Sequence, residues 1–179
     1  MSKNELTTEK MTQALGWAYE KALNGIPGDL SSESLAKSYM KRFSSTDEAI
    51  HSLIKWQTAK SSTSGFVTGL GGIVTLPVAV PVNIASVLYV QMRMIAAIAY
   101  MRGYDLKDDQ VQTFVFICLT GQAASDILKQ SGITVGTKLT VQLIKKVPGA
   151  TLTKINQKVA FRLVTKKKKK GVINLGKLV

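Results

Sequence analysis

Residues 61–92 read SSTSGFVTGLGGIVTLPVAVPVNIASVLYVQM, and none of these side chains is charged. Lys60 precedes the stretch and Arg93 follows it. A segment of this composition cannot form a soluble surface, so it must be buried in a protein core, in a membrane or against a partner. Which of these environments it occupies decides the fold and much of the function.

Two prolines divide the uncharged stretch. A single helix through it would contain Pro77 and Pro81, and a proline inside a helix costs about 3 kcal/mol or more. We therefore expect a helical hairpin with one arm at about 62–76 and the other at about 82–101.

The first arm carries small residues at helical spacing. Gly65 and Gly69 lie four residues apart, and Gly72 lies on the adjacent row. Residues four apart share a helix face, and small residues there let another backbone approach closely. The predicted helix-packing positions of the hairpin are Gly65, Gly69, Gly72, Pro77 and Pro81.

The hairpin is a poor candidate for two complete membrane spans. The first arm is shorter than the roughly 17–25 apolar residues that a span requires. The second arm contains Gln91 and Arg93, and a charge at a bilayer centre costs at least about 2.5–3.5 kcal/mol. Burial in the protein core, or insertion into one leaflet, fits better, and a groove on a partner is the third possibility.

The net charge of +13 is concentrated in the C-terminal part of the chain. All 11 Asp and Glu residues lie at or before Asp126, whereas 13 of the 24 Lys and Arg residues follow it. This asymmetry predicts contact with an anionic surface, either nucleic acid or anionic lipid. The residues predicted to bind that surface are Lys166, Lys167, Lys168, Lys169 and Lys170. Such a run is also typical of a solvated stretch, but an uncharged hairpin beside it favours lipid, where each Lys or Arg contributes about 1 kcal/mol.

Apolar residues recur with helical spacing along the chain, and no strand alternation with turn signals is present. Helix ends are indicated at Gly25 and Gly103, and Ser45 with Glu48 has the spacing of a capping box. The expected helices are 8–24, 32–43, one from 45 onward, the two arms, 105–130, 133–146 and 150–165, with a short strand as an alternative within 133–144. These patterns predict an all-α fold, a compact bundle of about six to seven helices around the uncharged hairpin. We expect one helical domain at 1–165 and a basic, mobile tail at 166–179.

Several spaced motifs resemble the EcsC protein family. They are GFVTGLGGIVTLP at 65–77, QMRMIAAIA at 91–99, GYD at 103–105, Lys138, TKIN at 153–156, FRL at 161–163, TK at 165–166 and GVINLGK at 171–177. The resemblance spans residues 12–179. It implies a bacterial, largely helical protein from a family named after a protein encoded beside an ABC transporter, and it implies no particular activity. Members usually continue with a Pro-x-x-Gly-Gly stretch and a further apolar helix, so we expect a C-terminally shortened member whose open apolar groove favours self-association.

Residue types that catalysis and metal binding require are scarce. His51 is the single histidine and Cys118 the single cysteine, whereas zinc sites need several such ligands. No Gly-x-Ser-x-Gly turn is present to supply a nucleophile, and GITVGTK at 132–138 lacks the spacing of a phosphate-binding loop. We therefore expect no enzyme activity, no metal and no cofactor.

Arg93 is the charged residue of the second arm, and a buried arginine needs an acceptor. Asp126 is the acid inside the next apolar helix and Asp105 is the nearest acid in sequence, so we predict a pair with Asp126 first and Asp105 second. Gln91 points away from Arg93 on the same helix. The predicted polar anchor comprises Gln91, Arg93, Asp105 and Asp126. Arg93 either fixes helix register through such a pair or binds an anionic headgroup or partner residue.

The N-terminus lacks the order of a signal peptide, and one cysteine excludes an intramolecular disulfide, so we expect a cytoplasmic protein. The favoured function is non-enzymatic association with the inner face of the cytoplasmic membrane, at an anionic lipid surface or a membrane transporter. The alternative is a soluble lipid-binding or lipid-modifying helical protein. A nucleic-acid binder ranks third, because base stacking requires aromatics among basic residues and Phe161 is the sole aromatic residue after Asp126.

Overall fold

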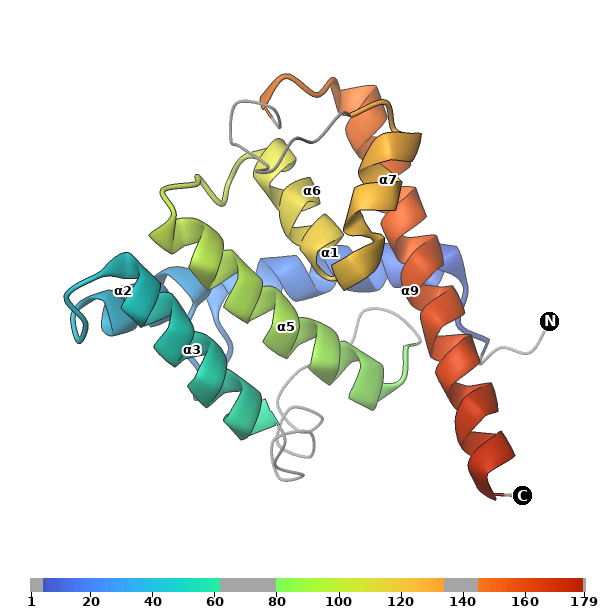
Figure 1. Ribbon diagram of the computed structural model, residues 1–179, viewed down its shortest axis with the longest axis horizontal. Coiled ribbons are helices and arrows are strands. Elements are labelled where there is room, and N and C mark those ends of the chain that lie inside the picture. Colours follow the sequence, from blue (N-terminus) through green and yellow to red (C-terminus); the bar gives the residue numbers. More distant parts are fainter. Residues whose placement is uncertain (1–4, 62–79, 134–144, 179) are drawn as a thin grey trace.

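Seven α-helices and one short 3₁₀-helix make up the described part of the computed structural model, residues 5–61, 80–133 and 145–178 (Figure 1). For 60–61 and 167–178 the description covers the backbone alone. The elements are α1 (Thr8–Asn24), α2 (Ser32–Met40), α3 (Thr46–Ser61), α5 (Val82–Met101), α6 (Asp109–Cys118), η1 (Gly121–Ala123), α7 (Ala124–Gln130) and α9 (Gly149–Leu178). These residues contain no β-strand, which confirms the predicted all-α fold.

α5 is the central helix of the fold. It packs against α1, α2, α3 and α6 (Figure 1). Its bounds, Val82 to Met101, are those predicted for the second arm, and Pro81 precedes it as the N-cap. Small buried residues at Ala96, Ala97 and Ala99 let neighbouring helices approach its backbone closely.

Two apolar clusters lie on different sides of α5. The larger cluster joins α1, α5, α6, α7 and α9, and its most buried members include Met11, Leu15, Met92, Val111, Val115, Ile155 and Val159. The smaller cluster joins α2 and α3 to α5 through Leu35, Tyr39, Ile50, Leu53, Ala97 and Met101. α5 therefore holds together two groups of helices that make few direct contacts with each other.

α5 is the one helix in the described segments that is long and apolar enough to cross a membrane. Half of its apolar stretch is buried inside the protein. A core helix packed by four others can have the same length and composition, and the two clusters cover much of the apolar surface of α5, although Val82 and Val87 stay exposed.

Several helix ends follow the signals read from the sequence. The backbone N–H of Glu48 donates to Ser45 Oγ at 3.2 Å, as a capping box requires. Gly103 has a φ of +88° and ends α5 in the left-handed conformation that favours glycine. Gly25 ends α1 with a φ of +77°.

The predicted helix at 105–130 is wrong as a continuous element. α6 begins at Asp109 and ends at Cys118, and η1 separates it from α7. Gly121 has a φ of +60° at this break, which a residue inside an α-helix cannot adopt. The chain therefore turns here and places α7 beside α9.

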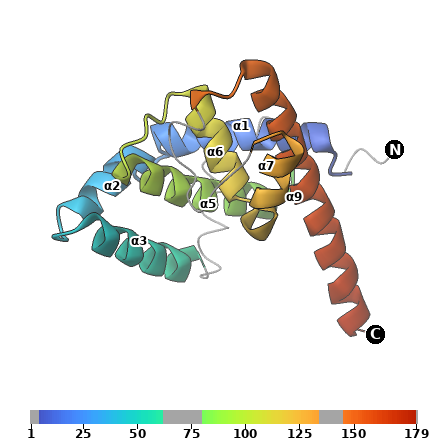
Figure 2. The same cartoon turned by 45° about the horizontal axis from the view of Figure 1, so that its top comes forward.

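α9 also differs from its prediction. It was expected at 150–165 but continues to Leu178, so its backbone crosses the proposed domain boundary at residue 165. The far half of α9 extends beyond the other helices (Figure 2). Whether this half is mobile stays a prediction. The predicted packing residues Gly65, Gly69, Gly72 and Pro77, and most of the predicted 133–146 helix, lie outside the described residues.

Candidate functional site

Arg93 lies buried on α5, with an exposed fraction of 1%. Its guanidinium forms an ion pair with Asp29 and donates to Leu30 O at 3.1 Å and to Gln57 Oε1 at 2.8 Å. Asp29 and Leu30 belong to the loop between α1 and α2, whereas Gln57 lies on α3. One side chain therefore ties three segments together.

The predicted partners of Arg93 were wrong. Asp126 lies exposed on α7, and Asp105 accepts a hydrogen bond from the backbone N–H of Lys107 at 3.0 Å. Gln91 is exposed on α5 and contributes nothing to the anchor. The carboxylate that Arg93 requires comes instead from Asp29, because the turn after α1 folds back over the middle of α5.

Tyr89 completes this polar cluster. Its hydroxyl lies 3.4 Å from Asp29 Oδ2, and the Arg93 guanidinium lies 5.8 Å from the centre of its ring. Burial raises the pKa of Tyr89 to about 12, against the opposing effect of the Arg93 charge. Because the chain itself occupies both terminal nitrogens of Arg93, the cluster is built to hold helices together rather than to bind an anion.

Basic side chains form a row on α9. Lys154, Lys158, Arg162 and Lys166 follow one another at intervals of four residues, so they share one face of the helix. All are exposed except Lys158, which is half-buried. Within the described parts of the chain, none of the four forms an ion pair.

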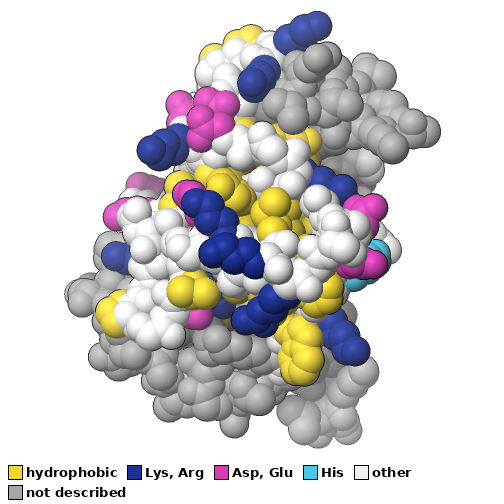
Figure 3. Space-filling model, turned by 90° about the vertical axis from the view of Figure 1, so that its left-hand side faces the viewer, with side chains coloured by type: hydrophobic (Ala, Val, Ile, Leu, Met, Phe, Trp, Pro, Cys, Tyr) yellow, Lys and Arg dark blue, Asp and Glu magenta, His cyan; other side chains and the backbone are white. Residues whose placement is uncertain are grey.

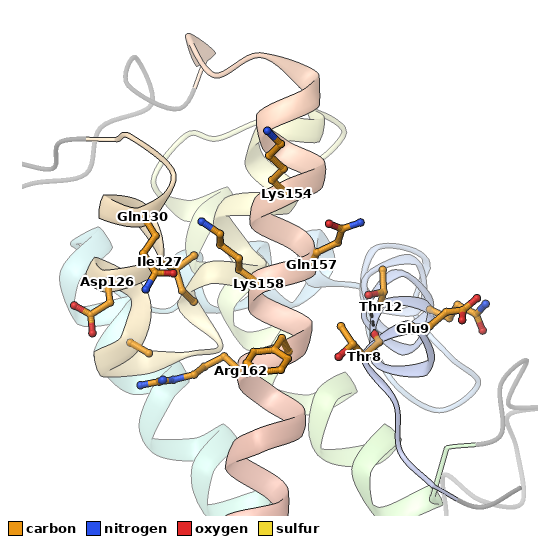
Figure 4. A pocket seen from close by; sticks show the side chains of 13 residues that line it. Thr8, Glu9, Thr12, Asp126, Ile127, Gln130, Lys154, Gln157, Lys158 and Arg162 are labelled. Carbon is orange, nitrogen blue, oxygen red and sulfur yellow. Dashed lines mark hydrogen bonds between the residues drawn. The ribbon is translucent and has the colours of Figure 1, made fainter. Parts of the chain in front are cut away.

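A pocket of about 760 Å³ opens between α1, α7 and α9 beside this row (Figure 4). From α9 it is lined by Lys154, Gln157, Lys158, Phe161 and Arg162. From the other helices it is lined by Thr8, Glu9, Thr12, Gln13, Ala123, Asp126, Ile127 and Gln130.

The side chains around the pocket separate by charge. Lys158 and Arg162 extend from α9 towards α7, Lys154 points along α9 towards its N-terminal end, and Gln157 points towards α1 (Figure 4). Glu9 and Asp126 point outwards at the two sides. Three cations and two acids line the pocket, and both carboxylates point away from α9, so the part of the pocket beside α9 is the more positive one.

The pocket also has an apolar part. Phe161 lies between Lys158 and Arg162 in the sequence and is 60% exposed, an unusual state for a phenylalanine. Ala123 and the buried Ile127 line the opposite side. The site can therefore hold a ligand that is anionic at one end and apolar at the other.

The face formed by α2 and α3 offers a contrast. Lys and Arg side chains gather on it as well, but Asp and Glu lie among them (Figure 3). Lys37 pairs with Glu33 at 2.6 Å, and Arg102 pairs with Asp47 at 2.8 Å. Because acids neutralise these cations, the row on α9 is the better anion-binding surface.

The prediction from the sequence named the Lys166 to Lys170 run as the anion-binding residues and missed the row of cations that precedes it on α9. Lys166 is exposed on α9, and the side chains of Lys167, Lys168, Lys169 and Lys170 lie outside the described residues. The spacing of four between Lys154, Lys158 and Arg162 was a visible signal. Its significance depends on α7, whose position beside α9 the sequence did not reveal.

The residues singled out for catalysis or metal binding lie apart from one another in the described segments. His51 is exposed on α3, and Cys118 is half-buried at the end of α6, where burial raises the pKa of its thiol to about 11. Over residues 5–61, 80–133 and 145–178, no group of three His, Cys, Asp or Glu side chains could hold a metal ion.

Comparison with known proteins gives one result. The model of the EcsC protein family matches residues 2–134, which include the helices from α1 to α7 but not α9. No curated protein and no solved structure matches the chain.

Proposed function

Since the chain belongs to the EcsC protein family, we propose that it acts without catalysis, as a cytoplasmic protein that associates with the anionic inner face of the cytoplasmic membrane. A membrane transporter with an acidic surface is the second partner that the same charges would suit.

The row of cations on α9 carries this proposal. Lys154, Lys158 and Arg162 are joined by Lys166 on one helix face, and the sequence has no acid after Asp126. Each Lys or Arg near an anionic leaflet contributes about 1 kcal/mol, so four together give substantial attraction. Phe161 stands exposed among them, and an aromatic side chain of this kind enters the membrane interface readily.

α5 is not the proposed membrane contact, although its length would allow a span. It lies among four other helices, and its buried Arg93 is paired with a loop and with α3. Moving α5 into a bilayer would separate that ion pair and expose two apolar clusters. Peripheral association through α9 leaves the core intact.

Sedimentation with lipid vesicles tests the proposal. We expect the protein to pellet with phosphatidylglycerol vesicles but not with phosphatidylcholine vesicles. Binding should decline as NaCl is raised towards 1 M, where the Debye length is about 3 Å. The triple variant Lys154→Gln, Lys158→Gln and Arg162→Gln should lose most of the binding.

A matched control removes the same charge elsewhere. Lys41, Lys55 and Lys107 are exposed and lie away from α9, so changing all three to Gln should leave most of the binding in place. If both triple variants lost the same amount of vesicle binding, the binding would depend on net charge alone and not on the row of α9. Full binding of the α9 variant at low salt would reject the proposal, and salt-dependent binding to nucleic acid but not to vesicles would favour the third function class.

A further inference from the structure

We infer that the pocket between α1, α7 and α9 is a specific site for an anionic glycerophospholipid, with its phosphate at the cations of α9 and its apolar part against Phe161. The inference rests on the proposed membrane association and adds a selective headgroup site to it. The pocket joins residues of α1 and α7, which the family model matches, to residues of α9, which lies beyond the match.

The cations of the pocket lie on successive turns of α9. Lys154 and Arg162 are eight residues apart, about 12 Å along the helix axis at 1.5 Å per residue. Lys158 lies midway and is half-buried. Long side chains of this kind can converge from both ends on a phosphate held near Lys158, and the guanidinium of Arg162 suits the geometry of phosphate oxygens.

Neutral polar groups surround this positive centre. Gln157 and Gln130 line the pocket and can donate hydrogen bonds to the hydroxyl or ester oxygens of a headgroup. Thr12 donates its hydroxyl to Thr8 O at 2.9 Å, which leaves the hydroxyl oxygen free to accept (Figure 4). Glu9 and Asp126 also line the pocket, and their carboxylates point away from α9, which keeps them at a distance from an anion held there (Figure 4).

The apolar wall separates a lipid from a free phosphate ion. Phe161 is 60% exposed, and Ala123 and Ile127 line the facing side. Inorganic phosphate would use the cations and gain nothing from these groups. Covering an exposed aromatic ring removes apolar surface from water and so stabilises a complex, which means that a ligand with both a phosphate and an acyl chain fits best.

The inference can be tested with a soluble lipid. Short-chain phosphatidylglycerol, kept below its critical micelle concentration, is titrated into the full chain by calorimetry. We expect saturable binding of one molecule, and weaker binding of short-chain phosphatidylcholine and of inorganic phosphate. Lys158→Gln and Arg162→Gln should each weaken phosphatidylglycerol binding about tenfold, the effect of losing one charge-assisted hydrogen bond.

Two further variants separate the parts of the site. Phe161→Ser should weaken binding of the short-chain lipid while leaving the weak binding of inorganic phosphate unchanged. Lys166→Gln is the matched control, because Lys166 belongs to the same row and does not line the pocket. Its affinity for the lipid should remain close to that of the wild type.

Each contrary result has a definite meaning. Equal affinities for phosphatidylglycerol and phosphatidylcholine would overturn the proposed selectivity for an anionic lipid. An affinity for inorganic phosphate equal to that for phosphatidylglycerol would overturn the proposed role of Phe161. Pelleting with anionic vesicles without any binding of the short-chain lipid would overturn the pocket and leave the proposed function standing. Absence of both would overturn the two together.

Discussion

Arg93 is the residue on which the arrangement of helices depends most directly. It is buried to 1% exposure and paired with Asp29. Removing one partner of a buried pair costs about 3–5 kcal/mol, because the other charge is left uncompensated. Arg93→Ala should therefore lower the free energy of unfolding by about that amount in urea titrations. Arg102→Ala should cost about 1 kcal/mol or less, since the Arg102–Asp47 pair is exposed to solvent.

A double-mutant cycle identifies the partner of Arg93. Combining Arg93→Met with Asp29→Leu should give a coupling above roughly 1 kcal/mol, whereas Arg93→Met with Asp126→Leu should give additive effects. Coupling to Asp126 but not to Asp29 would contradict the structure.

Because of Tyr89, the free energy of unfolding should decrease as the pH rises in the alkaline range. Burial raises its pKa to about 12 in the folded protein, above the value of about 10 in an unfolded chain. Between these values the unfolded chain releases the phenolic proton and the folded protein keeps it. The free energy of unfolding should therefore fall as pH rises from about 10 to about 12, having been unaffected by this group at lower pH.

Comparing Tyr89→Phe with the wild type isolates this contribution from that of the lysines. The free energy of unfolding of the variant should fall less steeply with pH than that of the wild type, and the two slopes should differ by up to about 1.4 kcal/mol per pH unit. Identical slopes for the two proteins, measured by urea unfolding at several alkaline pH values, would show that Tyr89 ionises as easily in the folded state.

From the sequence we could predict that Arg93 needs a carboxylate partner, but not which residue supplies it. An arginine in an apolar helix must find a carboxylate, and that requirement is local. The acid that meets it lies in a loop, and the Arg93–Leu30 hydrogen bond beside it spans 63 residues. Helical periodicity orders residues on one helix and carries no information about which loop folds over them, so Asp29 was passed over for two acids nearer in sequence.

At the scale of elements, the bounds of a helix could be predicted well where a proline or a glycine marks its ends. The bounds of α5 were predicted to the residue, because Pro81 and Gly103 mark its two ends. The break at Gly121 was missed, since an isolated glycine is tolerated in many helices. The length of α9 was underestimated because a lysine run was interpreted as a tail, although lysine has good helix propensity.

The turn between α1 and α2 allows a matched test of two glycines. Gly25 and Gly28 both have positive φ values, +77° and +84°. A Cβ added at Gly25 would lie 3.0 Å from Ser31 N and 3.2 Å from Asp29 O, whereas one at Gly28 would meet nothing within 4 Å.

Gly28→Ala should therefore cost only the strain of a left-handed residue, roughly 1–2 kcal/mol. Gly25→Ala should cost more by about 1 kcal/mol or more, because the backbone that carries Asp29 must also move. Thermal unfolding of both variants provides the comparison. Equal midpoints would mean that this turn relaxes without effect on the rest of the chain.

At the scale of the whole molecule, α5 divides the protein into two groups of helices. α2 and α3 form the smaller cluster with α5, and Gln57 on α3 receives a hydrogen bond from Arg93. Loss of that bond should loosen the smaller group without unfolding the larger one.

Hydrogen–deuterium exchange followed by mass spectrometry can detect this difference. In Arg93→Ala, amides of α3 should exchange faster than in the wild type, whereas amides of α1 and of residues 149–164 should change little. A uniform increase over all helices would show instead that the chain opens only as one unit.

The position of α1 has a consequence for the order of events during synthesis. α1 packs mainly against α5 and α9, so part of its apolar face stays uncovered until α9, which lies far later in the chain, has been synthesised. The group formed by α2, α3 and α5 needs only residues up to Met101 and can assemble on the nascent chain. Until α9 is released, the part of α1 that α9 covers is available to chaperones or to a neighbouring polypeptide, and this interval is when the protein is most vulnerable to aggregation.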